Sequence, residues 1–446
     1  MVILILAIGL YASFLPPHLI QESDAFSYHM TIPRQLLLRG SFEHIGWSFA
    51  DLYLLPVDFA LAPFWFCTKL PNKIPQFVFL LGLILASVSL AGKIGGRLSA
   101  SGICIMFGIL GTHSVGIQIG TAMLDLVLCY LFIAALDSFI EGKVFRSAIE
   151  FAFYFWSKPF MPVQAVLIIL LLIFSVWLIK RFKCKEIVWN LSSDIEPKGE
   201  IKRFILFFLA VSLFVAGPFV YKSMKAAGTP LFPLFTGLVK TSNTQQQINE
   251  LKAKSDQMLM AKDSYGYGRG IKEFVKHIWL IAVPEKEVNN KFDYPLGLVY
   301  LLCLGPFFGT IIKGFRQRKI AILPLIVIVF WTVWWMGSHQ SRFLYVPLIL
   351  MIIIVLSQDE FQSRLMHTGL IIALILTAAS VYRANKSDFG KNNYDVLRDK
   401  DKILLQMSKA VRKGETVTSV FHDVAFAEFK VDSIDYGSDY VLKQFK

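Results

Sequence analysis

The chain has 446 residues, of which 55% are hydrophobic and only 17% are charged, and its formal net charge is +13. A typical soluble domain has about 25% charged residues, so this composition excludes a soluble enzyme, a disordered chain and a disulfide scaffold. The five cysteines have no CxxC spacing and are expected to pack as small apolar residues. We therefore expect an all-α polytopic membrane protein.

A transmembrane helix needs about 20 mostly apolar residues, and eleven segments of the chain approach that requirement. The first has no basic residue before it and no small-residue cleavage site after it, so we expect a retained anchor. The expected spans are residues 1–17, 74–92, 98–115, 122–140, 147–162, 163–180, 203–221, 294–313, 320–337, 342–357 and 365–381.

Basic residues in short loops indicate the cytoplasmic side of a membrane protein. Together with the acidic residues beside them, the loops on one side of the expected spans carry nine more basic than acidic residues. Most of the net charge is therefore a signal of topology, and no nucleic-acid partner is expected. The four basic clusters are Lys93 with Arg97, Lys143 with Arg146, the segment 180–203 and the segment 313–319.

Segment 51–70 looks like a further span, but it contains Asp51 and Asp58. An acidic residue in the middle of a span is costly, so we expect this segment to lie against the outer face without crossing. The external regions are then the loop 18–73, the loop 222–293 and the tail 382–446.

The chain divides into a transmembrane domain, residues 1–381, and a small soluble C-terminal appendage, residues 382–446. The pattern of the appendage predicts a helix over about 393–412, capped by Gly414, and a strand over 416–421. The expected fold is thus an all-α membrane bundle of about eleven helices with external juxtamembrane helices and a small α/β appendage.

Acidic and basic side chains gather directly after the first span. Asp24 and Tyr28 are four residues apart and would share one face of a helix, with His29 beside them and Glu22 just before. A carboxylate, a phenol and an imidazole together are typical of acid–base chemistry or of a metal site. The alternative is that Asp24 only caps an amphipathic helix.

Further charged residues stand at the outer ends of expected spans. Asp125 begins an apolar helix, where an ionisable side chain is a functional candidate or a helix cap. Lys158 and Arg342 could neutralise a phosphate, or simply extend toward the membrane interface. Arg269, in the glycine-rich stretch YGYGRG, is a weaker candidate.

The order of these motifs on one side resembles the C-type membrane glycosyltransferases, which use polyprenyl-phosphate sugars. The similarity rests on the D-x-x-x-Y-H stretch at Asp24, on Asp125 before a span, on GTPLFPLF from Gly228 and on HQSRFLYVPL from His339. It extends over residues 1–381 and is greatest for the bacterial branch that includes protein mannosyltransferases and aminoarabinose transferases.

The resemblance implies roles for the acidic residues. Asp24 would be the catalytic base, and Asp125 a second acid near the acceptor or a metal. Glu22 lies two residues before Asp24, so which of the two acts is left open. Asp24, His29 and Asp125 could hold a divalent ion, although their spacing does not identify one, and no other cofactor is expected.

The mechanism implied is inverting transfer from a polyprenyl-phosphate sugar to a lipid, glycan or protein acceptor. Lys158, Arg342 and His29 would stabilise the charge of the departing phosphate, with Tyr28 and Arg269 also in the substrate-binding set. The expected location is a bacterial inner membrane, with the site on the periplasmic face. The alternatives are a lipid or polysaccharide flippase, and an O-antigen ligase or polymerase.

Overall fold

The computed structural model describes most of the transmembrane region and little of the tail. The residues described are 1–15, 17, 22, 24–45, 48–67, 72–95, 99–158, 161–181, 186–189, 198–241, 243–261, 265–283, 291–386, 389, 418–419 and 433–434.

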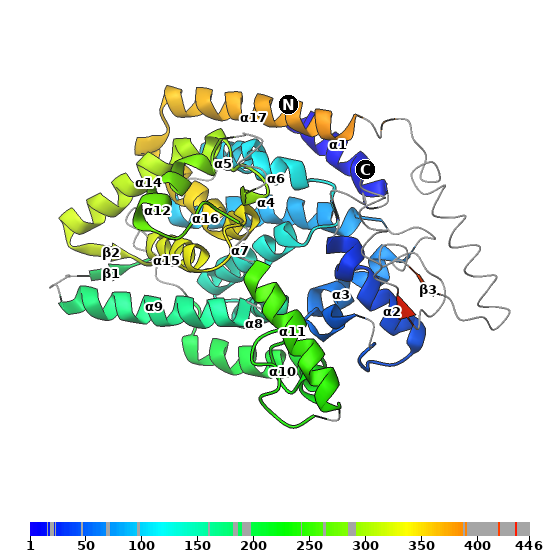
Figure 1. Cartoon of the computed structure of the whole chain (residues 1–446). Coiled ribbons are helices and arrows are strands. Elements are labelled where there is room, and N and C mark those ends of the chain that lie inside the picture. Colours follow the sequence, from blue (N-terminus) through cyan, green and yellow to red (C-terminus); the bar gives the residue numbers. More distant parts are fainter. Residues whose placement is uncertain are drawn as a thin grey trace.

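The described chain is largely helical, and most of its helices lie side by side in one body (Figure 1). The helices of this body are α1 (Val2–Phe14), α4 (Ile74–Gly95), α5 (Ser99–Gly111), α6 (His113–Gln118), α7 (Asp125–Glu141), α8 (Val144–Trp156), α9 (Met161–Arg181), α10 (Ile201–Ala227), α14 (Leu298–Gln317), α15 (Ile322–Met336), α16 (Tyr345–Leu356) and α17 (Arg364–Asn385).

Shorter elements connect these helices. They are the π-helix η1 (Ala25–His29), the helices α2 (Thr31–Arg39), α3 (Pro56–Trp65), α11 (Gln245–Ala261) and α12 (Ile271–Leu280), the 3₁₀ turns η2 (Phe49–Leu52), η4 (Ser341–Leu344) and η5 (Asp359–Phe361), and the strands β1 (Glu186–Val188), β2 (Lys319–Ala321), β3 (Thr418–Ser419) and β4 (Ser433–Ile434).

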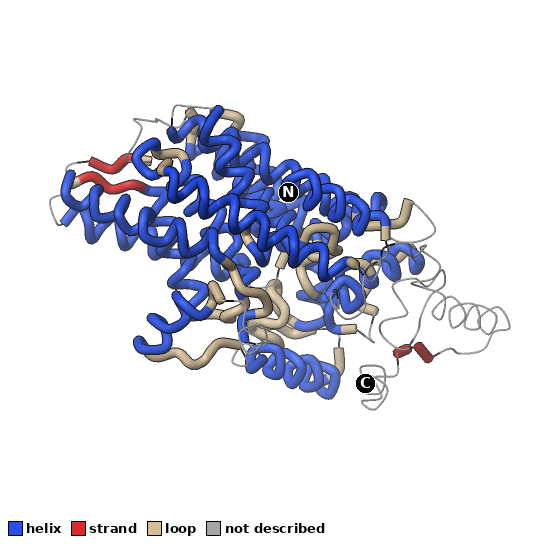
Figure 2. Tube along the Cα trace, turned by 90° about the horizontal axis from the view of Figure 1, so that it is seen from above, coloured by secondary structure: helices blue, strands red, loops and turns tan. Residues whose placement is uncertain are grey.

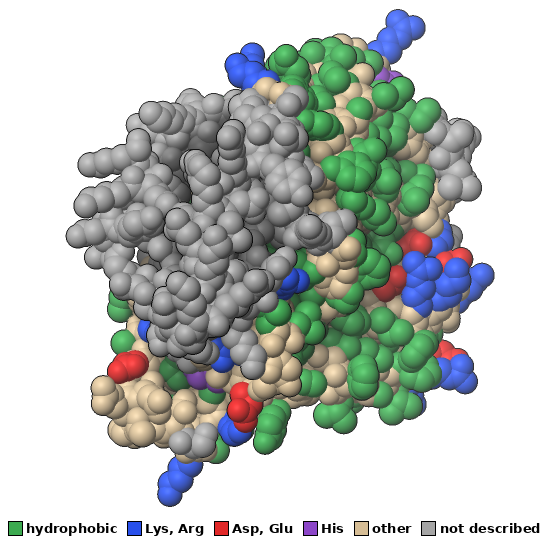
Figure 3. Space-filling view, turned by 90° about the vertical axis from the view of Figure 1, so that its right-hand side faces the viewer, with side chains coloured by type: hydrophobic (Ala, Val, Ile, Leu, Met, Phe, Trp, Pro, Cys, Tyr) green, Lys and Arg blue, Asp and Glu red, His purple; other side chains and the backbone are tan. Residues whose placement is uncertain are grey.

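Four of the described helices, α4, α10, α14 and α17, are long and apolar enough to cross a membrane, and the bent pair α8–α9 would make five. Helix α10 shows why a lipid environment is needed: Leu213 and Phe214 are 78% and 85% exposed. Figure 3 shows a broad area of hydrophobic side chains with small charged groups at its margin. The chain is an integral membrane protein, while the total of eleven spans stays a prediction.

The two ends of the bundle separate the residues predicted to lie on opposite sides. At one end Gln76 of α4 donates to the carbonyl of Ala122, just before α7, at 3.4 Å. At the other end Lys93 of α4 pairs with Asp137 of α7 at 2.8 Å. Helices α4 and α7 therefore run in the same direction. The parallel strands β1 and β2 lie at the end opposite α2 and α3 (Figures 1 and 2).

Helix α16 is central to the bundle, and all 12 of its residues are buried. Its sequence, YVPLILMIIIVL, is apolar on every side, as expected for a helix surrounded by others. It packs against α4, α5, α7, α14 and α15. The turn η4 immediately before α16 carries Arg342. The buried helix α16 therefore fixes the position of that side chain along the axis of the bundle.

Segment 51–70 contains no described helix long enough to cross. Helix α3 has 10 residues, about 15 Å at 1.5 Å per residue, against a hydrocarbon core of about 30 Å. Both of its acids are buried and paired with histidines: Asp51 with His44 at 2.8 Å, and Asp58 with His29. Both acids thus have partners inside the protein, and the position of the segment on the external face stays a prediction.

A second, smaller apolar cluster lies under the external loops. Phe232 of the GTPLFPLF stretch is fully buried there and stacks on Tyr53 at 6.1 Å between ring centroids. In the tail, β3 and β4 pair in parallel, and β3 falls within the strand predicted over 416–421. The helix predicted over 393–412 lies outside the described residues, so the α/β appendage stays a prediction.

Candidate functional site

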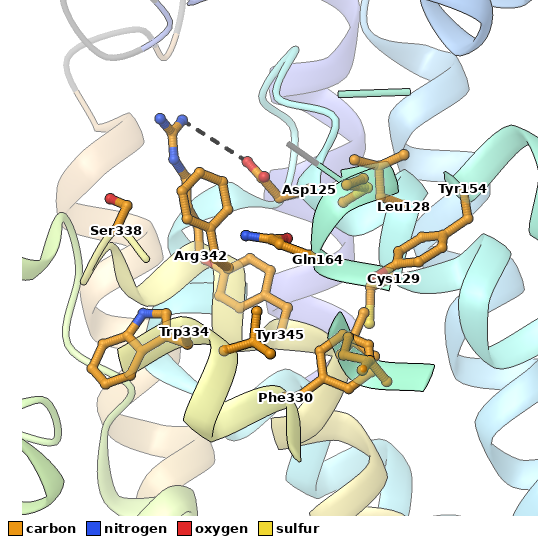
Figure 4. Close-up of a pocket in the computed structure, with 15 residues that line it drawn as sticks. Asp125, Leu128, Cys129, Tyr154, Gln164, Phe330, Trp334, Ser338, Arg342 and Tyr345 are labelled. Atoms are coloured by element: carbon orange, nitrogen blue, oxygen red, sulfur yellow. Dashed lines mark ion pairs between the residues drawn. The ribbon is translucent and has the colours of Figure 1, made fainter. Parts of the chain in front are cut away.

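Arg342 stands at the centre of a cluster of carboxylates at the end of the bundle that was predicted to be external. Its Nη1 donates to Asp24 Oδ2 at 2.8 Å and lies 4.0 Å from Asp125 Oδ2, while its Nε lies 3.3 Å from Asp293 Oδ2. Arg342 and Asp125 face each other at the top of a cavity (Figure 4). Residues more than 300 positions apart in the sequence therefore meet at one guanidinium.

A second cation completes the cluster. Lys158 Nζ donates to Asp125 Oδ1 at 2.5 Å, and the Phe343 ring lies within 5.1 Å of that ammonium and 5.5 Å of the Arg342 guanidinium carbon. The Lys158 and Arg342 side chains are only 14% and 15% exposed, and that of Asp125 is 4% exposed. Because water is largely excluded, these charges interact more strongly than surface charges do.

Each charged side chain is presented by the end of a helix or by a turn. Asp24 precedes the π-helix η1, whose Met30 N–H donates to the Ala25 carbonyl at 2.9 Å; such turns are frequent at functional sites. Asp125 is the first residue of α7. Asp293 has a φ of 69°, a left-handed conformation that aspartate tolerates better than most residues.

Tyr28 and His29 lie beside this cluster. His29 Nδ1 and Asp58 Oδ1 are 2.5 Å apart, and both side chains are essentially inaccessible to solvent. The Tyr28 ring lies against the His29 ring at a tilt of 48°, with the ring centroids 4.1 Å apart. Burial raises the pKa of the Asp58 carboxyl above its ordinary value, although His29 offsets part of that effect. The imidazole is thus fixed by a buried acid.

Glu22 occupies a different environment from Asp24. Its side chain is 2% exposed and its carboxylate accepts from Lys73 Nζ at 3.0 Å and from the backbone N–H of Ala122 at 2.5 Å. These contacts join the first external loop to the beginning of α4 and to the approach to α7. Between Glu22 and Asp24, the structure places only Asp24 against Arg342.

Arg269 lies at the end of α15. Its Nη1 donates to the carbonyls of Trp335 and Met336 at 3.0 Å each, a favourable place for a cation because the C-terminal carbonyls of a helix carry partial negative charge. This contact holds the glycine-rich loop against the bundle.

The cavity beside Arg342 has one polar end and apolar walls. Its lining includes the polar side chains of Asp125, Gln164, Ser338 and Arg342 and the apolar side chains of Leu128, Phe330 and Val346, from α7, α9, α15, α16 and the turn before α16 (Figure 4). Such a shape suits an amphiphile with an anionic head and an apolar tail. The walls are apolar faces of helices in the interior of the bundle.

The carboxyls of the cluster differ in their acidity. Burial by itself would raise the pKa of Asp24, but Arg342 above all, with His29 and Lys158, holds it below its ordinary value. Burial raises the pKa of Asp293, because Arg342 offsets only part of the cost of removing that carboxylate from water. The pKa values of two carboxyls on one guanidinium are therefore shifted in opposite directions, which is typical of functional sites.

A metal site is not formed by the side chains that the sequence suggested. Among the described residues, no three His, Cys, Asp or Glu side chains come together in a way that could hold a metal ion. Asp24 and Asp125 face Arg342, and His29 faces Asp58.

Four of the residues selected from the sequence come together: Asp24, Asp125, Lys158 and Arg342. Two acids that contact candidate residues, Asp58 and Asp293, were not among the candidates. Asp58 had a signal, because its charge did not fit a membrane span. Asp293 has no motif around it, and only its contact with Arg342 identifies it.

The fold and the site together define a helical integral membrane protein with a pocket that charged side chains line. Its structure is similar to that of ArnT from Cupriavidus metallidurans bound to undecaprenyl phosphate, with a TM-score of 0.51 and 12% identity over 95% of this chain and 72% of that chain. The structure of the same protein in the apo state gives 0.50 and 12% over 94% and 72%. No protein-family model and no curated protein sequence matches the chain. The resemblance predicted from the motifs is therefore confirmed at the level of the fold.

Proposed function

We propose that this protein is a membrane glycosyltransferase, which transfers a sugar from a polyprenyl-phosphate donor to an acceptor at its external face. One observation carries the proposal: beside a cavity, the partly buried Arg342 pairs with the candidate base Asp24, and Lys158 pairs with Asp125, which also lies near Arg342. The shared fold with ArnT, whose structure holds undecaprenyl phosphate, supports the choice of lipid.

The donor phosphate would bind to Arg342 and Lys158. A guanidinium can form two parallel hydrogen bonds to phosphate oxygens, and an ammonium adds a compact positive charge. The polyprenyl chain would follow the apolar walls of the cavity between α7, α15 and α16. This arrangement would bind both the phosphate and the polyprenyl chain of the donor, and it would leave the sugar at the external side.

Transfer then takes place in one displacement. The acceptor hydroxyl gives its proton to the Asp24 carboxylate while its oxygen forms a bond to the anomeric carbon. The bond between that carbon and the phosphate oxygen breaks, and its electron pair leaves with the phosphate. Arg342 and Lys158 stabilise the negative charge that develops there, an effect worth several kcal/mol in a preorganised site. Attack from the opposite face inverts the anomeric centre.

The location of the charges favours this enzyme over a flippase. A transporter is expected to hold ionisable side chains near the middle of its membrane helices. In α4 and α7, by contrast, Lys93, Asp125 and Asp137 lie toward helix ends. An O-antigen ligase or polymerase would share the lipid-linked donor and differ in its acceptor.

The test is the binding of undecaprenyl phosphate to the full chain in lipid nanodiscs, measured by native mass spectrometry. The wild-type protein should bind the phosphate and not the alcohol undecaprenol, and the double variant R342Q/K158Q should lose that preference. A matched control is K93Q, which removes a cation at the other end of the bundle. Equal binding of phosphate and alcohol by the wild type would overturn the proposal.

A further inference from the structure

Asp293 is the third carboxylate on Arg342, and the transfer scheme above gives it no part. Its Oδ2 lies 3.3 Å from Arg342 Nε, and the two side chains are 18% and 15% exposed. Neither atom has a hydrogen-bond partner among the described residues. The contact is thus a partly buried ion pair at the guanidinium edge that Asp24 does not use.

The backbone around Asp293 is tied to the elements that carry Arg342. Tyr294 N–H donates to the hydroxyl of Ser341, the residue before Arg342, at 3.3 Å. Leu296 N–H donates to the Ile281 carbonyl at 2.7 Å. The left-handed φ of 69° at Asp293 costs free energy and persists only when its surroundings impose it. The carboxylate is therefore set in place by its neighbours.

Charge balance shows what an arriving phosphate must displace. Three carboxylates, those of Asp24, Asp125 and Asp293, surround the two cations Arg342 and Lys158. A donor phosphate adds a further negative charge to this cluster. Competition for the cations favours release of a carboxylate, and Asp24 on Nη1 is the partner that the reaction needs released.

We propose that Asp293 is a positioning residue, which holds the Nε edge of Arg342 while the donor phosphate replaces Asp24 at the Nη edge. This inference rests on the proposed function and deepens it. When Asp24 releases Arg342, the contact at Nε keeps the guanidinium in place. The guanidinium then stays aligned with the bond between the anomeric carbon and the phosphate oxygen, which breaks in the reaction. The carboxylate of Asp24 is then free to accept the acceptor's proton only in the donor-loaded enzyme, so the donor binds first.

Replacing the Asp293 carboxylate by an amide is an informative substitution. Because burial raises the pKa of this carboxyl, its charge is poorly stabilised, and replacing it by an amide is not expected to unfold the chain. The lost negative charge also favours an incoming phosphate. A positioning role thus predicts a separation between binding and turnover that a purely structural role does not.

The experiment compares D293N with D293E and with the control D137N, which neutralises a similarly buried carboxylate paired with Lys93 at the other end. D293N should lower kcat about tenfold, as expected for a misplaced charge-stabilising group, while the donor KM stays equal or falls. D293E should restore part of kcat, and D137N should behave as wild type. A D293N enzyme with normal kcat, or with a raised donor KM and unchanged kcat, would overturn the inference.

Binding of undecaprenyl phosphate separates this inference from the proposed function. If wild-type protein binds the phosphate selectively and D293N binds it at least as well, the positioning role stands on its own readout. If the wild type binds and D293N loses binding as R342Q does, Asp293 is part of the phosphate site, and the positioning role is wrong. If the wild type fails to bind at all, the proposed function fails first.

Discussion

The two ends of the bundle hold their charges in different ways. At the end that holds the candidate site, Arg342 and Lys158 are 15% and 14% exposed and meet carboxylates from three separate segments. At the opposite end, Lys143 and Glu141 are 52% and 42% exposed and lie two residues apart. Surface pairs of the second kind contribute little, whereas buried charges are costly and cluster at functional sites. The difference supports the proposal that the reaction takes place at the Arg342 end of the bundle.

The largest expected effect is at Asp24. D24N should reduce transfer at least about a thousandfold, since an amide cannot accept the acceptor's proton. The thermal unfolding temperature should change little, because Asn still accepts a hydrogen bond from Arg342. Transfer of sugar from a polyprenyl-phosphate donor, measured with purified protein in nanodiscs, checks the loss; near-normal turnover would remove Asp24 as the base.

The next effect is at Arg342. R342Q should lower kcat/KM for the donor by about 100-fold, because the phosphate loses a charged partner in the ground state and in the transition state. The matched change at the other end, K93Q, should leave kcat/KM within a factor of two or so of wild type. Steady-state kinetics at varied donor concentration measures both, and equal losses would erase the contrast between the two ends.

The pH profile sharpens the role of the Asp24–Arg342 pair. The pKa of Asp24 is held below its ordinary value by Arg342 against burial, so in wild type the acid limb of kcat/KM should lie below the ordinary carboxyl range. Without the cation, burial acts alone and raises that pKa, since the charged form is no longer stabilised. R342Q should therefore move the acid limb to higher pH. An unmoved limb would mean that another group controls it.

Glu22 tests stability where Asp24 tests chemistry. E22A leaves Lys73 buried and without this carboxylate, and breaking a buried pair costs about 3–5 kcal/mol. The unfolding temperature should therefore fall clearly, while the remaining folded protein keeps its donor KM. Thermal unfolding in detergent, followed alongside activity, measures this. A stable E22A protein that has lost only kcat would assign Glu22 to the reaction after all.

The smallest effect is at the surface pair between Lys313 and Glu360, whose side chains are 45% and 46% exposed. K313Q should change the free energy of unfolding by less than about 1 kcal/mol, as exposed pairs do, and leave transfer unaltered. The same assays serve as the measurement. A large loss of activity would show that the end of the bundle opposite Arg342 also takes part in function.

The sequence predicts much of the external cluster because its members stand where helices begin or end. Asp125 and Arg342 interrupt or border apolar segments, where an ionisable side chain is costly and is therefore a functional candidate. Asp51 and Asp58 likewise predicted that segment 51–70 does not cross the membrane. The helix in that segment, α3, has only 10 residues. The informative signal in the sequence was therefore a charged residue in a segment that is otherwise apolar enough for a membrane.

Pairings across the fold could not be read in that way. Asp293 contacts Arg342 through a loop geometry that no local pattern specifies. Glu22 and Asp24 differ by two residues in sequence, yet one faces Lys73 and the other faces Arg342. Which acid meets which cation depends on tertiary packing.

A structure of the full chain with undecaprenyl phosphate in a nanodisc would test the central claim most directly. The account predicts that the phosphate lies within hydrogen-bond distance of Arg342 and Lys158, with the chain between α7, α15 and α16. Asp24 should then have left Arg342 Nη1, and Asp293 should still contact Nε. Phosphate bound elsewhere, with the Asp24–Arg342 pair intact, would contradict the account.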